Sequence, residues 1–86
     1  MDSKPYIDDI KNEYVLRSFG ENIDPIELKW HRDLFDRKIE VLEQTNWLLQ
    51  LENQLPEKIS TNFIPKGVWH RLIKGSGELK IKIYEI

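Results

Sequence analysis

The sequence contains no cysteine, which excludes disulfide bridges, thiolate metal sites and a thiol nucleophile. Long apolar runs are also missing, and pairs such as Leu48-Leu49 are far too short for a membrane span or the core of a secretory signal. Glycine is scarce, and Gly75-Ser76-Gly77 has the composition of a hairpin turn rather than of a phosphate-binding loop. We therefore expect a protein that does not contact membranes and works in the cytoplasm.

A strong excess of one charge is absent as well, because 13 Lys/Arg and 15 Asp/Glu leave a net charge of −2. The charges are unevenly distributed, since residues 58–84 carry six Lys/Arg and a single Glu. This basic end could attract an anionic ligand, or Lys80 and Lys82 could simply form the solvent face of a strand. Nucleic-acid-binding domains show a clearer basic excess, so we do not expect nucleic acid as a partner.

Alternating apolar and polar residues predict β-strands over most of the chain. No spacing typical of βαβ units occurs, so the strands indicate an all-β fold, an antiparallel barrel or jelly-roll sandwich. A chain of 86 residues accommodates one such domain, spanning residues 1–86. The expected strands are 14–19, 26–33, 37–42, 47–52, 58–64, 68–73 and 79–84.

Residues 4–14 follow a different pattern. Pro5 suits the first position of a helix, and apolar residues then recur at helical spacing. We therefore predict a short helix or turn within residues 1–14, which closes one end of a barrel formed by residues 15–86. The residues at helical spacing are Tyr6, Ile7, Ile10 and Tyr14.

A turn followed by an aromatic strand is the most informative local feature. Pro65 fixes its own φ and Gly67 tolerates a positive φ, so the two residues predict a sharp reversal. The strand that follows carries Trp69 and His70. A histidine placed just after a rigid turn, at the opening of the barrel, is well positioned to bind a ligand or a metal ion.

This P-x-G-x-x-H arrangement, which ends at His70, resembles the second signature motif of the cupin superfamily. The first cupin motif carries H-x-H and a following glutamate, and here His31 and Asp33 match the histidine pair while Arg37 stands near the glutamate position. The chain is most similar to small single-domain cupins, and in particular to uncharacterised cupin-like proteins of phages. The resemblance implies a cupin barrel, with only part of the metal-ligand set of that superfamily.

His31, Asp33 and His70 form a candidate metal site. Residues two apart on a strand project from the same face, so His31 and Asp33 point together. With His70 facing them, the three side chains would make a two-histidine, one-carboxylate site for a divalent ion such as iron, manganese, nickel or zinc. The apolar residues of 26–33 occupy the other face, however, and both ligands would point to solvent if that face lined the core. The alternative is a surface charge network of these residues with Arg32, Arg37 or Arg71.

The same region predicts a ligand site. Guanidinium groups bind carboxylates and phosphates through two parallel hydrogen bonds, so a cleft at the barrel mouth could hold a small anionic ligand or a protein partner. The residues that we expect to line this cleft are His31, Arg37, Trp69, His70 and Arg71. The alternative is an internal ion-pair network, in which Asp33 pairs with Arg37 or Asp36 pairs with Arg71.

The three tryptophans differ in their expected roles. Large aromatic side chains fill the cores of small barrels, and we expect this role for Trp47 and Trp30. Trp69 neighbours His70, and we therefore expect it to contact a ligand.

Three functions are compatible with the sequence. The first is a binding module without chemistry, the second is a metal-dependent enzyme, and the third is a structural, oligomer-forming protein. A homodimer is expected because several apolar residues fall on strand faces opposite the predicted core. These residues are Leu48, Ile64, Val68 and Leu72.

Overall fold

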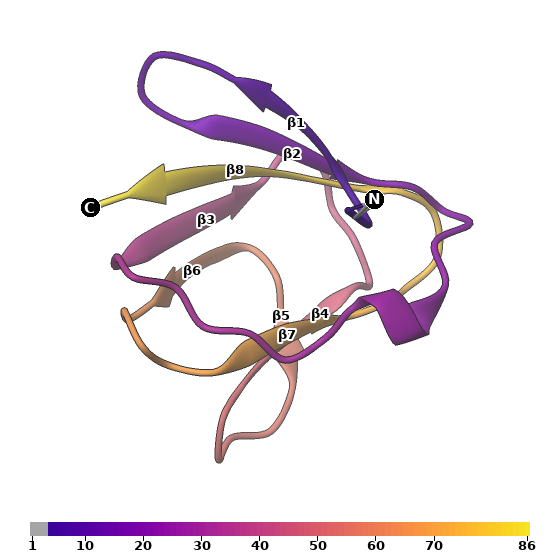
Figure 1. The fold of residues 1–86 in the computed structure, drawn as a ribbon. Coiled ribbons are helices and arrows are strands. Elements are labelled where there is room, and N and C mark those ends of the chain that lie inside the picture. Colours follow the sequence, from indigo (N-terminus) through magenta and orange to yellow (C-terminus); the bar gives the residue numbers. More distant parts are fainter. Residues whose placement is uncertain (1–3) are drawn as a thin grey trace.

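The computed structural model describes residues 4–86 and is built almost entirely of antiparallel strands in two sheets (Figure 1). The larger sheet has the order β1-β2-β8-β3-β6, and the smaller has the order β5-β4-β7. No single closed barrel is formed by the described residues, so the architecture is a sandwich of two sheets. The strands are β1 (Ile7–Ile10), β2 (Val15–Phe19), β3 (Arg37–Val41), β4 (Leu48–Leu51), β5 (Glu57–Lys58), β6 (Thr61–Ile64), β7 (His70–Ile73) and β8 (Leu79–Glu85).

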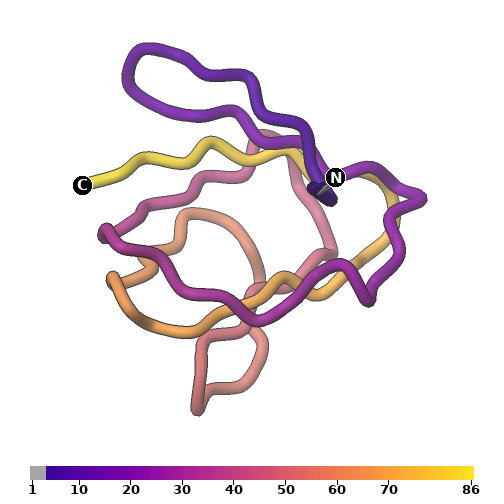
Figure 2. The backbone as a smooth tube through the Cα atoms, in the orientation of Figure 1, coloured from indigo at the N-terminus to yellow at the C-terminus, as the bar shows by residue number. Residues whose placement is uncertain are grey.

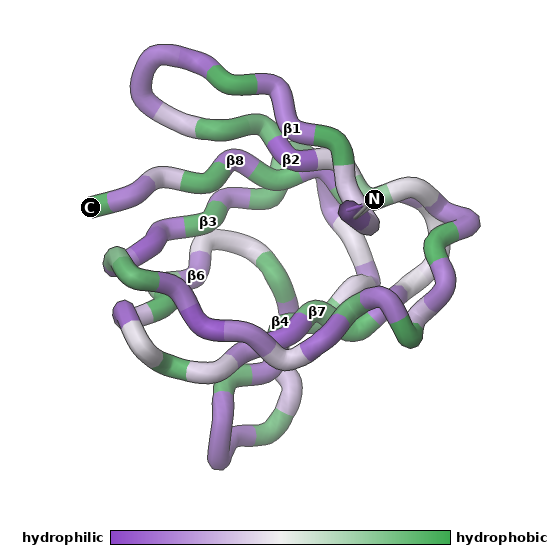
Figure 3. The backbone as a smooth tube through the Cα atoms, viewed as in Figure 1, coloured by the Kyte–Doolittle hydropathy of each residue, from purple (hydrophilic) through white to green (hydrophobic). Residues whose placement is uncertain are grey.

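The last strand organises the larger sheet. β8 lies between β2 and β3 and pairs antiparallel with both. Hydrophobic and hydrophilic positions alternate along it (Figure 3), so that Leu79, Ile81 and Ile83 are buried while Lys80 is exposed. This period of two places one face of the sheet against the core and the other in solvent.

The core lies between the two sheets. Leu49 and Leu51 of β4 face the buried residues of β8 and β3 across it. Trp47 is 0% exposed, and its indole Nε1 donates a hydrogen bond to the carbonyl oxygen of Gly77 at 3.1 Å. The expected core role of Trp47 is thus confirmed, with its one polar atom satisfied. Trp30 is 40% exposed, and its expected place in the core was wrong.

The N-terminal helix prediction was wrong, because this segment forms β1 and pairs with β2 in a hairpin. Ile7 and Ile10, which belonged to the expected apolar stripe, are 77% and 79% exposed. A helix this short is marginal unless tertiary packing covers its apolar face. Pairing with the edge of β2 satisfies the backbone instead, and only Tyr6 of this stretch packs against the core.

The continuous strand expected over residues 26–33 is also absent. Pro25–Glu27 forms a 3-10 turn, η1, capped by the Asp24 carboxylate, which accepts a hydrogen bond from the Ile26 amide at 3.1 Å. This turn resets the phase of the alternation, so Ile26 is 73% exposed and His31 alone pairs with a strand. Figure 2 shows the chain after η1 running beside β7 before it enters β3.

Three of the four residues expected to form a second apolar face belong to the core or pack against it. Ile64 is 3% exposed and belongs to the core. Val68 and Leu72 are partly buried and pack against that core. Leu48 is partly buried, so the four residues do not form the expected second apolar face, while the homodimer itself stays a prediction.

The reversal predicted at residues 65–67 is confirmed. Gly67 has a φ of 77°, and its amide donates to the carbonyl oxygen of Asp33 at 2.9 Å. The Val68 amide donates to the carbonyl oxygen of Pro65 at 3.3 Å. The turn therefore directs the chain into β7 and ties it to the segment that carries Asp33.

Replacing Gly67 with valine should destabilise the protein by about 1–3 kcal/mol, because a β-branched residue is strained at positive φ. An added Cβ would meet no atom within 4 Å, so the loss would arise from the backbone alone. Urea unfolding measures the change. Gly20→Val is the matched control, since Gly20 also has open space but no positive φ. Equal losses for the two variants would contradict the explanation.

Replacing Trp47 with alanine should cost about 3–5 kcal/mol, which is enough to unfold a marginal domain of this size. The exposed Trp30 supplies the control, and Trp30→Ala should cause a much smaller loss because the Trp30 side chain buries less apolar surface. Thermal unfolding followed by circular dichroism compares the two variants. Similar stability of both would show that the core does not depend on Trp47.

Candidate functional site

Two backbone hydrogen bonds bring the histidines together. His31 and His70 form an isolated antiparallel bridge, with N–O distances of 3.0 and 2.8 Å. Their rings meet edge to face with centroids 4.2 Å apart. His31 is exposed, whereas His70 is only 4% exposed, so the pair reaches from the surface to the interior. His70 is thus buried rather than at the opening, where the sequence analysis had placed it.

Asp33 completes the cluster. Its Oδ2 lies 3.3 Å from Nε2 of His70, and its Oδ1 lies 3.3 Å from Nη1 of Arg37. Potential ligand atoms of His31, Asp33 and His70 all lie within 4.8 Å of one another. The predicted trio is therefore assembled, and the concern that His31 and Asp33 point to solvent, away from His70, does not hold. The Asp33–Arg37 pair of the alternative network is present too.

The hydrogen bonds of the two histidines define which nitrogen carries the proton. Nδ1 of His31 contacts the Lys29 carbonyl oxygen at 3.2 Å, and Nδ1 of His70 contacts the Val68 carbonyl oxygen at 2.8 Å. A carbonyl oxygen only accepts, so Nδ1 must be the donor in each ring. In a neutral imidazole the lone pair is then on Nε2, which is the arrangement usual for histidines that bind metal ions.

Burial lowers the pKa of His70 below its ordinary value. The hydrogen bond to Val68 and the Asp33 carboxylate raise the pKa, His31 and Arg37 lower it, and the net direction is downward. A lowered pKa keeps the ring neutral at pH 7, so its Nε2 lone pair is available as a ligand.

The contact between His70 and Asp33 is the feature that fits a cation. Oδ2 of Asp33 is buried, and it has no hydrogen-bond partner among the described residues. It faces Nε2 of a neutral His70, so two electron-pair donors meet at 3.3 Å with no hydrogen between them. Two ligand atoms that each lie about 2.1 Å from one ion are about 3.0–3.4 Å apart. The donor set and this spacing both fit a divalent metal ion.

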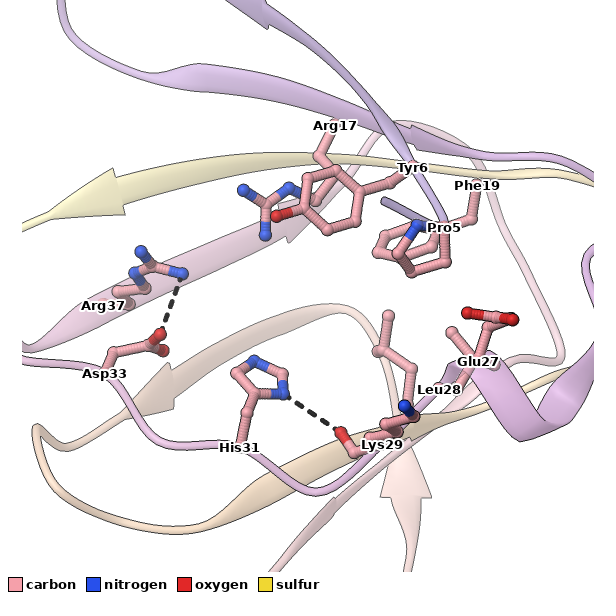
Figure 4. A pocket seen from close by; sticks show the side chains of 11 residues that line it. Pro5, Tyr6, Arg17, Phe19, Glu27, Leu28, Lys29, His31, Asp33 and Arg37 are labelled. Carbon is pink, nitrogen blue, oxygen red and sulfur yellow. Dashed lines mark hydrogen bonds and ion pairs between the residues drawn. The ribbon is translucent and has the colours of Figure 1, made fainter. Parts of the chain in front are cut away.

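A cleft of about 360 Å³ opens beside the cluster (Figure 4). A smaller space of about 40 Å³ shares several lining residues with it; His31 lines both spaces, and His70 lines the smaller one. The walls of the cleft combine apolar side chains with a few charged ones, as is usual for small-molecule sites. The lining residues include Tyr6, Arg17, Phe19, Leu28, His31, Asp33, Arg37 and Leu72.

The residues predicted for ligand binding divide into two groups. His31, His70 and Arg37 line the cleft or the space behind it. Trp69 and Arg71 line neither, because their side chains alternate with that of His70 and lie on the other face. There the Arg71 Nε donates to Gln50 Oε1 at 3.0 Å, rather than pairing with Asp36 as the alternative network had it.

Two cleft residues, Arg17 and Tyr6, were missed in the sequence analysis. Arg17 projects from β2 and pairs with Asp8 of β1, directly opposite in the hairpin register. The only signal was the opposite charge of Asp8 and Arg17, and it became interpretable only with a hairpin in place of the expected helix.

No protein-family model and no curated protein match the chain, whereas solved structures do. A cupin domain from Bordetella pertussis is 21% identical, with a TM-score of 0.68 over 100% of this chain and 97% of its own. An RmlC-like cupin family protein from Methanocaldococcus jannaschii, with a double-stranded β-helix fold, is 15% identical, with a TM-score of 0.70 over 98% of this chain and 82% of its own.

This chain has the cupin fold. A third similar structure comes from a study of DMSP lyases; it is 17% identical, with a TM-score of 0.68 over 85% of this chain. The chain spans only 37% of that protein. Among residues 4–86, no helix is long and apolar enough to cross a membrane.

His70 of the metal-free protein should carry its proton on Nδ1 at pH 7, because Val68 offers only an acceptor. Two-bond proton–nitrogen NMR correlations of the imidazole report the tautomer directly. A ring protonated on both nitrogens, or a neutral ring with its proton on Nε2, would show that Nε2 has no free lone pair for a metal ion.

Proposed function

We propose that this cupin domain binds a divalent metal ion through His31, Asp33 and His70 and holds a small molecule beside it in the cleft. The observation that carries the proposal is the buried contact between Nε2 of His70 and Oδ2 of Asp33, which has no donor to fill it. Leaving a buried carboxylate oxygen without a partner costs about 1–3 kcal/mol or more, and a cation at this position would remove that cost. Iron, manganese, nickel and zinc all accept this donor set.

The residues of the chain have distinct parts in such a site. The Lys29 and Val68 carbonyl oxygens orient the two imidazoles, and Arg37 holds the far oxygen of the Asp33 carboxylate. His31 lies on the open side and borders the cleft, so a small molecule there would reach the cluster from solvent. A bound divalent ion would supply Lewis-acid polarisation to an oxygen of that molecule.

A metal-free binding module for a small anion is the second candidate. It is favoured by the two guanidinium groups, Arg17 and Arg37, that line the cleft together. Both candidates use the same cleft, and they differ in whether Asp33 and the histidines need an ion.

Metal addition should raise the melting temperature of protein that was purified without a histidine tag and stripped of metal. At a free metal concentration 100 times the dissociation constant, binding adds about 2.7 kcal/mol, or about 10–20 °C for a domain of this size. Manganese, iron(II), nickel and zinc should be compared by differential scanning fluorimetry. No rise with any of the four would refute the metal site.

Asp33→Asn should abolish this rise and leave the metal-free protein about as stable as before. The asparagine carbonyl can still accept from Arg37, while its amide can donate to Nε2 of His70, which the carboxylate cannot do. Asp9→Asn is the matched control, because Asp9 is an exposed carboxylate on β1 and should leave the rise unchanged. A large metal-free destabilisation by Asp33→Asn would instead assign Asp33 to a purely structural ion pair.

A further inference from the structure

Arg17 is fixed in the wall of the cleft by two neighbours from the N-terminal segment. Its Nε and Nη2 donate to the two carboxylate oxygens of Asp8 at 2.7 and 2.9 Å. Its guanidinium carbon lies 3.7 Å from the centre of the Tyr6 ring, as Figure 4 displays for these two side chains. The Arg17 and Asp8 side chains are only 16% and 26% exposed. The plane of the guanidinium is therefore set in advance, which lowers the ordering cost of binding a ligand.

Asp8 uses only one edge of this guanidinium. The group has five N–H donors, and Asp8 accepts one from Nε and one from Nη2. Among residues 4–86, Nη1 of Arg17 has no hydrogen-bond or ion-pair partner. The remaining end edge, formed by Nη1 and the second N–H of Nη2, offers two parallel donors whose spacing matches the two oxygens of a carboxylate.

The charge of the cleft limits the kind of anion. Arg17, Lys29 and Arg37 contribute three positive charges to the lining, and Glu27 and Asp33 contribute two negative ones. The Asp8 carboxylate, which pairs with Arg17, brings this sum to zero, so a monoanion would leave one negative charge in excess and a dianion such as phosphate would leave two.

Apart from Tyr6 and His31, the remaining lining residues are apolar. Pro5, Phe19, Leu28 and Leu72 contribute apolar surface to the cleft that Arg17 lines. A volume of about 360 Å³ stands at the small end of the range for ligand sites. The cleft therefore suits a compact apolar body with one charged group.

We infer that the cleft recognises a small organic monocarboxylate, whose carboxylate binds the end edge of the Arg17 guanidinium while its apolar body lies against Phe19 and Leu28. This inference rests on the ligand-binding cleft of the proposed function but does not require the metal ion. Asp8 and Tyr6 act as positioning residues, because each touches Arg17 and orients it.

Benzoate, titrated into the metal-stripped 86-residue chain and followed by NMR, tests the inference. Benzoate should shift the Arg17 Nε–H resonance and the β2 amides, with a dissociation constant of about 1–10 mM, as expected for so small a molecule. Benzamide, of the same shape but neutral, and inorganic phosphate should each bind at least about 10-fold more weakly.

Arg17→Lys keeps the charge but loses the two-donor edge, and it should weaken benzoate binding at least about 10-fold. Arg71→Lys, on the other face of β7, is the matched control and should bind benzoate as the parent does. If Arg17→Lys does not fold, the Arg17 Nε–H shift in the parent protein decides the question alone. Equal binding of benzamide, preferential binding of phosphate, or benzoate shifts away from Arg17 would each overturn the inference.

The two proposals fail separately. A chain that binds benzoate through Arg17 but gains no stability from metal supports the carboxylate site and refutes the metal site. A chain that is stabilised by metal but does not bind benzoate refutes the carboxylate site alone.

Discussion

The two backbone hydrogen bonds between His31 and His70 hold the histidines of the candidate metal site together. They fasten the segment after η1 to β7, which also pairs with β4 in the smaller sheet. The amide of Gly67 adds a third tie, to the carbonyl oxygen of Asp33, just before β7 begins. The side chains of the cluster thus come from a short extended stretch and a strand far along the sequence. Without these few hydrogen bonds, His31 and Asp33 would belong to a long exposed loop.

The sequence revealed the members of the cluster better than their surroundings. The P-x-G turn and the period of two around His31 are local signals, and local signals are what sequence patterns carry. The apolar alternation over residues 26–33 indicated the wrong face, because Asp24 and Pro25 start a 3-10 turn that interrupts it. The sheet order and the burial of His70 depend on contacts between distant segments, and no pattern within one segment encodes them.

The role of Arg17 could not be predicted from a local sequence pattern either. Its role depends on β1 being a strand, because only the hairpin register places Asp8 beside it. Ile7 and Ile10 do have helical spacing, but both side chains are exposed in the structure. A helix here would therefore lack the tertiary contacts that stabilise short helices. The hairpin is stabilised instead by the Arg17–Asp8 ion pair and by the contact of Arg17 with the Tyr6 ring, which form only when β1 pairs with β2. Because a helix or turn was predicted for this segment in place of a strand, the wall of the cleft formed by Arg17 and Tyr6 was missed.

The two proposals are linked by charge at Asp33. Its carboxylate contacts Arg37 with one oxygen and His70 with the other, so it stands between the guanidinium and the histidines. Among the described side chains, Asp33 Oδ2 and Arg37 Nε are the buried polar atoms that lack hydrogen bonds, and they belong to neighbouring residues in this one cluster. Two such atoms cost a small domain a substantial part of its stability. A divalent ion would satisfy the Asp33 oxygen and add positive charge beside the cleft. That charge would strengthen the attraction for a carboxylate at Arg17, so metal and anion should each bind more tightly in the presence of the other.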